Sequence, residues 1–262
     1  MSGISPERAY EFIRLDCDGA VATITIDNQR KANAISVRVA TEIGKAIDAV
    51  AADPGLRAAI ITGAGRNFIG GADIGELQQL DAITARDFIR HLHKTFEKIR
   101  NIEKPVIAAV NGACLGAGLE LAICCDIVLA ADGAVFGMPE VELGIPSVIE
   151  AALLLNLIGA HRTKEFLLTG DRWDAARAER HGLINDVVTP AELLLRARAM
   201  ADRIARHSPM AVALQKDLVT RWMTTDLDTA IELGVNAFGI AFTSGGPQAA
   251  LTAWKEKRLP LK

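Results

Sequence analysis

Two glutamates in this sequence lie in apolar surroundings next to glycine-rich segments. Glu120 directly follows the segment Asn111-Gly-Ala-Cys-Leu-Gly-Ala-Gly-Leu119, and Leu, Ala and Ile come after it. Glu140 lies further along, in Phe136-Gly-Met-Pro-Glu-Val-Glu-Leu-Gly144. A carboxylate in such surroundings must be paired, hydrogen-bonded or raised in pKa, and a raised pKa makes it a useful general acid or base. Each glutamate could instead cap a helix or face water, because spacing alone does not bring the two side chains together.

Two glycine-rich segments each stand between an apolar stretch and a helical pattern: Gly63-Ala-Gly-Arg-Asn-Phe-Ile-Gly-Gly-Ala-Asp73 and the segment that ends at Glu120. Glycine lets a ligand approach the main chain closely, and the first N–H groups of a helix have no internal partner. Two such amides aimed at one point would form an oxyanion hole. A strand-to-helix turn also uses glycine without any ligand, so each segment alone allows both interpretations. Neither segment carries a phosphate-loop or dinucleotide fingerprint.

The elements that must position these segments alternate between strands and helices. Continuous or alternating apolar runs predict strands, and apolar residues at helical spacing predict helices. We expect strands at 21–27, 58–62, 105–110, 127–130, 134–136 and 183–188. We expect helices at 36–50, through 88–99, at 119–125, at 148–158 and between Asp174 and Gly182. Buried strands that alternate with helices predict an α/β architecture with parallel sheets.

The chain after Pro190 has no further strand pattern. Helices are expected to start at Pro190, at Ser208-Pro209 and near Asp228, because each start offers an N-cap residue or a proline at the first helical position. We therefore divide the chain into a core of residues 1–190 and a helical region of residues 191–262. The apolar stripes of the helical region would need the core or another subunit to cover them.

Composition and charge exclude several classes of protein. Half of the 262 residues are hydrophobic and 23% are charged, which argues against intrinsic disorder. The 29 basic and 32 acidic side chains give a net charge of −3, so the chain lacks the electrostatic footprint of a nucleic-acid-binding protein. Its apolar runs are far shorter than the roughly 20 residues that span a bilayer, and residues 1–15 lack the apolar stretch of a secretory signal. We expect a soluble, cytoplasmic protein without membrane or nucleic-acid partners.

Cysteine usage indicates the same compartment. Cys17, Cys114, Cys124 and Cys125 match no metal-binding spacing, and the sequence contains no CxxC. We expect buried, reduced thiols and no metal site.

Several segments, in order and in register, resemble one enzyme family. Phe68-Ile-Gly-Gly-Ala-Asp-Ile-Gly-Glu76 is similar to F-x-x-G-A-D-[IL]-x-E. Lys104-Pro-Val-Ile-Ala-Ala-Val-Asn-Gly-Ala-Cys-Leu-Gly-Ala-Gly-Leu-Glu-Leu-Ala122 is similar to K-P-[VI]-I-A-x-[VI]-x-G-x-x-x-G-x-G-x-E-L-A. The sequence thus resembles the enoyl-CoA hydratase/isomerase (crotonase) family from about residue 10 to its end. The resemblance implies an α/β, crotonase-like superhelix of ββα units, followed by a helical C-terminal oligomerisation region.

The resemblance also implies the parts of an active site. The backbone N–H groups of Ala72 and Ala117 match an oxyanion hole for the thioester oxygen of a coenzyme A ester. Glu120 and Glu140 match the two catalytic glutamates of the hydratases, of which Glu120 would activate water for attack at C3 and Glu140 would protonate C2. The residues that match coenzyme A-binding positions are Lys31, Ala32, Gly70, Asp73, Ile74 and Lys257.

The presence of both glutamates favours hydration of a trans-2-enoyl-CoA thioester. Water addition needs one group to activate water and another to protonate carbon, whereas double-bond isomerisation can use a single base. Isomerase, C–C lyase and thioester hydrolase activities are alternatives, because the family uses one oxyanion hole for all of them. A non-catalytic or RNA-binding member of the fold is the alternative from a different class. The resemblance implies an acyl-CoA substrate, no separate cofactor, and a homotrimer or a dimer of trimers.

The segment after the second glutamate departs from the family pattern. Many hydratases follow the second glutamate with G-x-x-P-G-x-G-G-T, whereas this chain has Leu143-Gly-Ile-Pro-Ser-Val-Ile-Glu-Ala151. These residues would lie where the acyl chain passes, which predicts an acyl group of unusual size or polarity. We expect the additional acid, Glu150, to face solvent or cap a helix, with a third functional carboxylate as the alternative.

Overall fold

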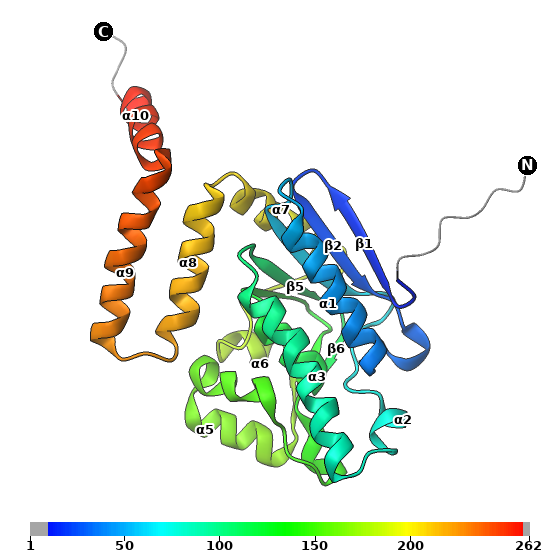
Figure 1. The fold of residues 1–262 in the computed structure, drawn as a ribbon. Helices are drawn as coiled ribbons and strands as arrows, with labels where there is room; N and C mark the ends of the chain where they lie inside the picture. The colour runs from blue at the N-terminus through cyan, green and yellow to red at the C-terminus, as the bar shows by residue number, and fades with distance from the viewer. Residues whose placement is uncertain (1–9, 259–262) are drawn as a thin grey trace, which may run out of the picture.

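A six-stranded sheet lies at the centre of the computed structural model, which describes residues 10–258 and the side chains of residues 10–256 (Figure 1). The first two strands form an antiparallel hairpin that turns at Gly19, and all later neighbours in this sheet are parallel. In spatial order the strands are β1 (Ile13–Asp18), β2 (Val21–Ile26), β3 (Ala58–Gly63), β5 (Val106–Val110), β7 (Ile127–Ala131) and β10 (Asp186–Val188). The expected α/β architecture with a parallel sheet is confirmed.

A second sheet of four short strands lies beside the first. Its order is β4 (Asn67–Ile69), β6 (Ala113–Leu115), β8 (Val135–Gly137) and β9 (Arg172–Asp174). Along the chain, three strands of the first sheet are each followed by one strand of the second sheet and then by helical structure. The strand pairs are β3 with β4, β5 with β6, and β7 with β8. This repeated order is the ββα superhelix that the family resemblance implies.

Sequence analysis missed β1, which has six residues, and the three-residue strands β4, β6 and β9. β4 and β6 have three residues each and lie inside the two glycine-rich segments, where alternation cannot be recognised over so few positions. β10 begins at Asp186, later than the predicted start at 183. The residues before it, Leu183 and Ile184, are buried in a turn that follows Gly182, where φ is +78°.

Three helices follow strands of the two sheets near the glycine-rich segments. α1 (Val37–Ala52) begins at Ser36, whose side chain accepts a hydrogen bond from the Val39 N–H, and α3 (Ala82–Asn101) begins with a capping box at Asp81. α1 and α3 pack against each other. α4 (Ala117–Cys124) is short and buried on every side, as expected for a helix that is apolar all round.

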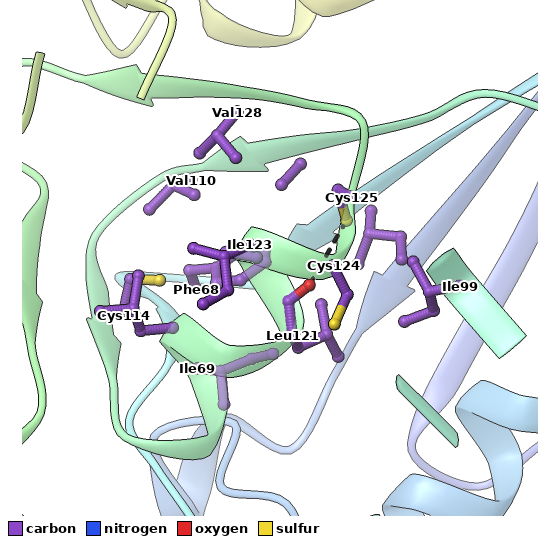
Figure 2. Packing of buried hydrophobic residues seen from close by; sticks show 14 of the residues in the cluster. Phe68, Ile69, Ile99, Val110, Cys114, Leu121, Ile123, Cys124, Cys125 and Val128 are labelled. Atoms are coloured by element: carbon purple, nitrogen blue, oxygen red, sulfur yellow. Dashed lines mark hydrogen bonds between the residues drawn. The ribbon is translucent and has the colours of Figure 1, made fainter. Parts of the chain in front are cut away.

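The core around α4 consists mainly of small and branched side chains (Figure 2). Cys114, Cys124 and Cys125 are buried there, and burial raises the pKa of all three thiols, which keeps them protonated. The Cys125 thiol donates to the Leu121 carbonyl over 3.6 Å. The four cysteines are free thiols, but the expectation that all are buried is wrong for Cys17, which is exposed on β1.

The region after Glu140 differs from the predicted single helix at 148–158. It consists of the 3-10 turns η2 (Pro139–Leu143) and η3 (Ile149–Leu153), followed by α5 (Leu154–Thr169) and α6 (Ala175–Arg180). Val148 is extended, and Ile149 has a φ of +39°, so an α-helix cannot begin there. Gly159, at φ +77°, interrupts α5 again. Asp174 caps α6 as predicted, since its side chain accepts from the Arg177 N–H.

The last part of the described chain is helical, with no strand after β10. It comprises α7 (Leu193–Ala205), α8 (Pro209–Trp222), α9 (Leu227–Ala241), η4 (Phe242–Ser244) and α10 (Gly246–Arg258). α7 packs on β3 and β5, whereas α9 and α10 extend away from the sheets (Figure 1). The division at residue 190 stays a prediction. Within residues 10–258, no helix is both long and apolar enough to cross a bilayer.

Candidate active site

A cavity of about 490 Å³ opens between the two glycine-rich segments, η2 and the middle of α3. Every residue predicted for the site lines this cavity except Ala32 and Lys257. Ala32 instead supports the wall, because its carbonyl accepts a hydrogen bond from the Gly70 N–H over 2.9 Å. Lys257 belongs to α10, and its side chain lies outside the described part of the structure.

Two backbone hydrogen bonds join the residues around Ala72 to Ile35, which precedes α1, and neither bond uses the Ala72 N–H. Ile35 donates to the Gly71 carbonyl over 2.8 Å, and Asp73 donates to the Ile35 carbonyl over 2.9 Å. These two bonds use the groups on either side of Ala72. Gly71 has a φ of +126°, a conformation that favours glycine. The Ala72 N–H is therefore a candidate hydrogen-bond donor to a ligand in the cavity.

Ala117 begins α4, so its N–H has no partner inside the helix. Gly116 precedes it at φ +49°, and a Cβ added at Gly116 would lie only 3.9 Å from the Gly71 Cα. Gly118 packs against β4 so closely that a Cβ there would come within 2.4 Å of the Ile69 carbonyl oxygen. The glycines thus bring the two segments side by side, with Ala72 and Ala117 both on the cavity wall.

Glu120 projects from the first turn of α4 and is 4% exposed. One carboxylate oxygen, Oε1, accepts a hydrogen bond from the Ala151 N–H over 3.1 Å. Burial raises the pKa of Glu120 to about 8, and the negative charges of Glu140 and Glu150 act in the same direction, against the effect of the Ala151 N–H. A buried carboxyl with a pKa near neutrality can exchange protons at physiological pH.

Glu140 enters the same cavity from η2. Its Oε2 accepts a hydrogen bond from the Ser147 hydroxyl over 2.7 Å, and its Oε1 points toward Gly116. The cavity therefore holds two glutamate carboxyl groups from different elements beside the two candidate amide donors. Sequence analysis did not identify Ser147, because the sequence around a loop serine does not reveal which residue its hydroxyl binds.

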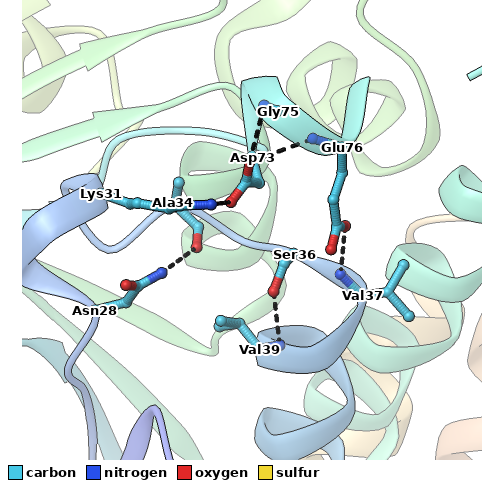
Figure 3. Close-up of polar contacts among 9 residues, drawn as sticks. All are labelled: Asn28, Lys31, Ala34, Ser36, Val37, Val39, Asp73, Gly75 and Glu76. Atoms are coloured by element: carbon cyan, nitrogen blue, oxygen red, sulfur yellow. Dashed lines mark hydrogen bonds and ion pairs between the residues drawn. The ribbon is translucent and has the colours of Figure 1, made fainter. Parts of the chain in front are cut away.

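An ion pair stands at another part of the cavity wall. Lys31, in the turn η1 (Gln29–Lys31), reaches Asp73, with 2.5 Å between Nζ and Oδ2 (Figure 3). Asp73 is buried and caps α2 (Ile74–Leu77) by accepting from the N–H groups of Gly75 and Glu76. The hydrogen bond from Lys31 is the main reason that the pKa of Asp73 lies below its usual value. A lysine at a cavity edge is a suitable point charge for phosphate groups.

Asn33 is a buried residue that sequence analysis did not assign to the site. It has a φ of +59°, and its Nδ2 donates to the carbonyls of Ala64 and Asn67 over 2.9 and 2.8 Å. Its Oδ1 accepts from the Asn28 N–H over 2.9 Å. Asn33 thereby fixes the segment that carries Lys31 to the glycine-rich segment. The sequence signal for this role is an asparagine between two elements, because asparagine tolerates a positive φ better than most residues do.

The expectation that Glu150 faces solvent or caps a helix is wrong. Glu150 is 2% exposed, and its Oε1 lies 2.6 Å from Nδ1 of His93 on α3. The left-handed backbone of Ile149 accompanies this inward placement. Burial raises the pKa of Glu150, while the contact with His93 opposes the rise.

The remaining cavity wall is mostly apolar. Phe88, Ile89 and Leu92 face it from α3, and Leu77 and Val148 complete this side. In the part of the chain that the structure describes, no group of three or more His, Cys, Asp or Glu side chains could hold a metal ion. The cavity therefore combines an apolar side with two carboxyl groups and two candidate amide donors.

The fold and this site define a crotonase-fold α/β enzyme. The model of the enoyl-CoA hydratase/isomerase family matches residues 16–261, so the chain belongs to this family, and the resemblance seen in the motifs is confirmed. A crotonyl-CoA hydratase from Syntrophomonas wolfei is 42% identical over 252 residues, which cover 95% of this chain and 97% of the relative. A short-chain-enoyl-CoA hydratase from Clostridium acetobutylicum is 39% identical, with 93% and 94% covered.

Solved structures show the same similarity. An enoyl-CoA hydratase subunit from Geobacillus kaustophilus superimposes with a TM-score of 0.92 at 33% identity, covering 97% of this chain and 99% of the other. The enoyl-CoA hydratase from Bacillus anthracis gives a TM-score of 0.91 at 32% identity, with 96% and 98% covered. The crotonase fold predicted from the motifs is thereby confirmed.

Proposed function

We propose that this protein is an enoyl-CoA hydratase that adds water across the C2=C3 double bond of a trans-2-enoyl-CoA thioester. The observation that carries the proposal is the convergence of Glu120 and Glu140 on one cavity that Ala72 and Ala117 also line. Relatives named as crotonyl-CoA and short-chain-enoyl-CoA hydratases, similar over nearly the full chain, support it. We place the protein in the cytoplasm.

The two alanine amides hold the thioester oxygen. Attack of water at C3 moves electrons through the conjugated system and leaves enolate-like charge on that oxygen. Donors that are already oriented stabilise this charge without rearrangement, and one such donor is typically worth about 3–4 kcal/mol. Ala72 and Ala117 provide main-chain N–H groups, so their methyl side chains do not affect this role.

The two glutamates divide the proton transfers. Glu120 accepts a proton from water as the water oxygen bonds to C3, and Glu140 donates a proton to C2. The product is the 3-hydroxyacyl thioester, and a proton returned from Glu120 to Glu140 through solvent completes the cycle. The raised pKa of Glu120, about 8, makes it a stronger base than an exposed carboxylate. The Ser147 hydroxyl orients the carboxyl group of Glu140.

Coenzyme A binds along the edge that carries Lys31. In this arrangement Lys31 faces the phosphates, the Gly70 carbonyl accepts from the adenine amino group, and Asp73 and Ile74 form the adjoining wall. Lys257 contributes a second basic group, and Ala32 acts through its hydrogen bond with Gly70. Coenzyme A is part of the substrate, and the reaction written above requires no separate cofactor.

The acyl group points toward the apolar wall of α3. Phe88, Ile89 and Leu92 offer hydrocarbon contacts there. A short, apolar acyl chain such as crotonyl fits this lining.

The chain assembles with further copies of itself, as a homotrimer or a dimer of trimers. Ile231, Val235, Phe238 and Phe242 follow one another at helical spacing on α9 and η4, and all four are exposed. Such a stripe on a helix that extends from the core is stabilised when another apolar surface covers it.

Hydration of crotonyl-CoA, followed as the loss of the enoyl absorbance, tests the proposed function. We expect turnover by the parent, and a fall in kcat of roughly 100-fold or more in Glu120→Gln and in Glu140→Gln. Glu142→Gln is the matched control, because Glu142 lies on the same turn but pairs with Arg172 at the surface. The assignment is wrong if neither Glu120→Gln nor Glu140→Gln lowers turnover by about tenfold. Double-bond migration in place of hydration would identify an isomerase.

A further inference from the structure

The buried carboxylate of Glu150 and the partly exposed ring of His93 contact each other next to Ala151, the residue whose N–H binds Glu120. Oε1 of Glu150 contacts Nδ1 of His93 over 2.6 Å, and the Glu150 side chain is almost fully buried. Its other oxygen, Oε2, is buried with no hydrogen-bond partner among the described residues. Glu150 does not line the cavity. The proposed catalytic steps give this pair no role, although a buried carboxylate carries a substantial desolvation cost.

The chain connects this pair directly to Glu120. Ala151 follows Glu150, and its N–H donates to Oε1 of Glu120 over 3.1 Å. η3, which contains both residues, packs against α4 and α3. A displacement of Glu150 would therefore move the N–H group that holds the Glu120 carboxylate.

The backbone before Glu150 needs support of this kind. Ile149 has a φ of +39°, in the left-handed region that β-branched residues disfavour. Such a conformation persists only when surrounding contacts hold it. Two of these contacts follow immediately in the chain: Glu150 with His93, and Ala151 with Glu120.

We propose that Glu150, anchored by His93, is a positioning residue that sets the orientation and the electrostatic environment of Glu120 through η3. The catalytic consequence rests on the proposed hydratase function. Anchoring by His93 holds the Ala151 N–H on Glu120, and the negative charge of Glu150 favours the protonated form of Glu120.

The charged groups around the pair determine the direction of the effect. Glu120 is influenced by Glu140 from η2 and by Glu150 from η3, and both raise its pKa. Glu150 is influenced by His93 and Arg100 from α3, which lower its pKa, and it adjoins Glu120 and Cys124 of α4. Neutralising Glu150 should therefore lower the pKa of Glu120.

Substitutions at Glu150 separate anchoring from charge. Glu150→Gln keeps an acceptor for His93 and removes the charge, whereas Glu150→Ala removes both. We expect the acid limb of the kcat/KM profile for crotonyl-CoA to move to lower pH in Glu150→Gln, with most of kcat retained. We expect Glu150→Ala and His93→Ala to lower kcat by about tenfold or more with little change in KM, because Glu120 is misplaced. His91→Gln is the matched control on α3, where His91 pairs with Thr41 instead.

A second readout does not depend on turnover. Carbon-13 NMR of carboxyl-labelled glutamate follows the titration of Glu120, whose signal is assigned by its loss in Glu120→Gln. We expect Glu120 to titrate at lower pH in Glu150→Gln than in the parent and in His91→Gln. Melting curves identify variants that do not fold. If Glu150→Ala does not fold, His93→Ala removes the same contact from a partly exposed position.

The outcomes distinguish the two proposals. An unchanged Glu120 titration in Glu150→Gln, with an unchanged acid limb, overturns the positioning role while hydration stands. A raised KM with parental kcat also overturns it, because Glu150 would then contact substrate. A shifted titration in a protein that does not hydrate crotonyl-CoA supports the positioning role and overturns the proposed function.

Discussion

Gly116 and Glu140 lie so close together that a Cβ at residue 116 would come within 2.5 Å of Oε1 of Glu140. The Glu140 carboxylate thus occupies space that a side chain at residue 116 would fill. Gly116 also has a φ of +49°, so its conformation suits glycine in its own right. Glycine at this one position therefore suits both the start of α4 and the space that a proposed proton donor occupies.

The first prediction concerns this contact. Gly116→Ala should displace the Glu140 carboxylate and strain the backbone at the start of α4, which lowers kcat for crotonyl-CoA by about tenfold or more. The strain should also lower the free energy of unfolding by about 1–3 kcal/mol. Steady-state kinetics and chemical denaturation measure the two effects. Gly133→Ala is the control, because a Cβ at Gly133 meets no atom within 4 Å. Parental kcat in Gly116→Ala would contradict the role of this contact.

The second prediction concerns pH. Glu120 must be deprotonated to accept a proton from water, and its pKa is raised to about 8. We therefore expect kcat/KM to rise with pH toward about pH 8, by about tenfold per unit well below it. Initial rates over roughly pH 6 to 9 measure the profile. A rate that falls as pH rises through this region would instead make Glu120 the proton donor and exchange the roles of the two glutamates.

The third prediction concerns Lys31. Lys31→Gln should raise KM for crotonyl-CoA by about threefold to tenfold at low salt, with a smaller effect at high salt, because an exposed point charge is screened. The KM for crotonyl-pantetheine, which lacks the nucleotide phosphates, should stay unchanged. Lys45→Gln on the exposed face of α1 controls for the loss of one positive charge. An equal rise of KM for both thioesters would show that Lys31 acts on the pocket and not on phosphate.

The fourth prediction concerns assembly. Phe238 is 70% exposed, and its ring lies 5.0 Å from that of Phe242. Phe238→Asp should dissociate the oligomer, because a charge in an apolar interface is desolvated without a partner. Light scattering after size exclusion measures the mass against the 28.0 kDa of a single chain. Leu168→Asp on α5, a comparably exposed apolar position, is the control. A parent protein that elutes as a monomer would contradict the proposed trimer.

The sequence was sufficient for the framework of the molecule. Long buried strands such as β3 and β5 contain enough apolar residues in a row to be recognised, and side-chain caps such as Ser36 and Asp174 mark helix starts locally. The motifs around Gly70 and Gly116 indicated the family because their residues are close together in the chain. Local patterns predict local structure, and a family resemblance carries the rest.

The tertiary structure alone decided which polar groups meet. Glu150 contacts His93, which lies 57 residues earlier in the sequence, and Asn33 reaches Ala64 and Asn67. Nothing in the residues around Glu150 distinguishes a buried acid from an exposed one, since its burial results from the backbone of Ile149 and the packing of η3 on α3 and α4. Such pairings depend on how separate elements pack, and that packing is a property of the whole chain.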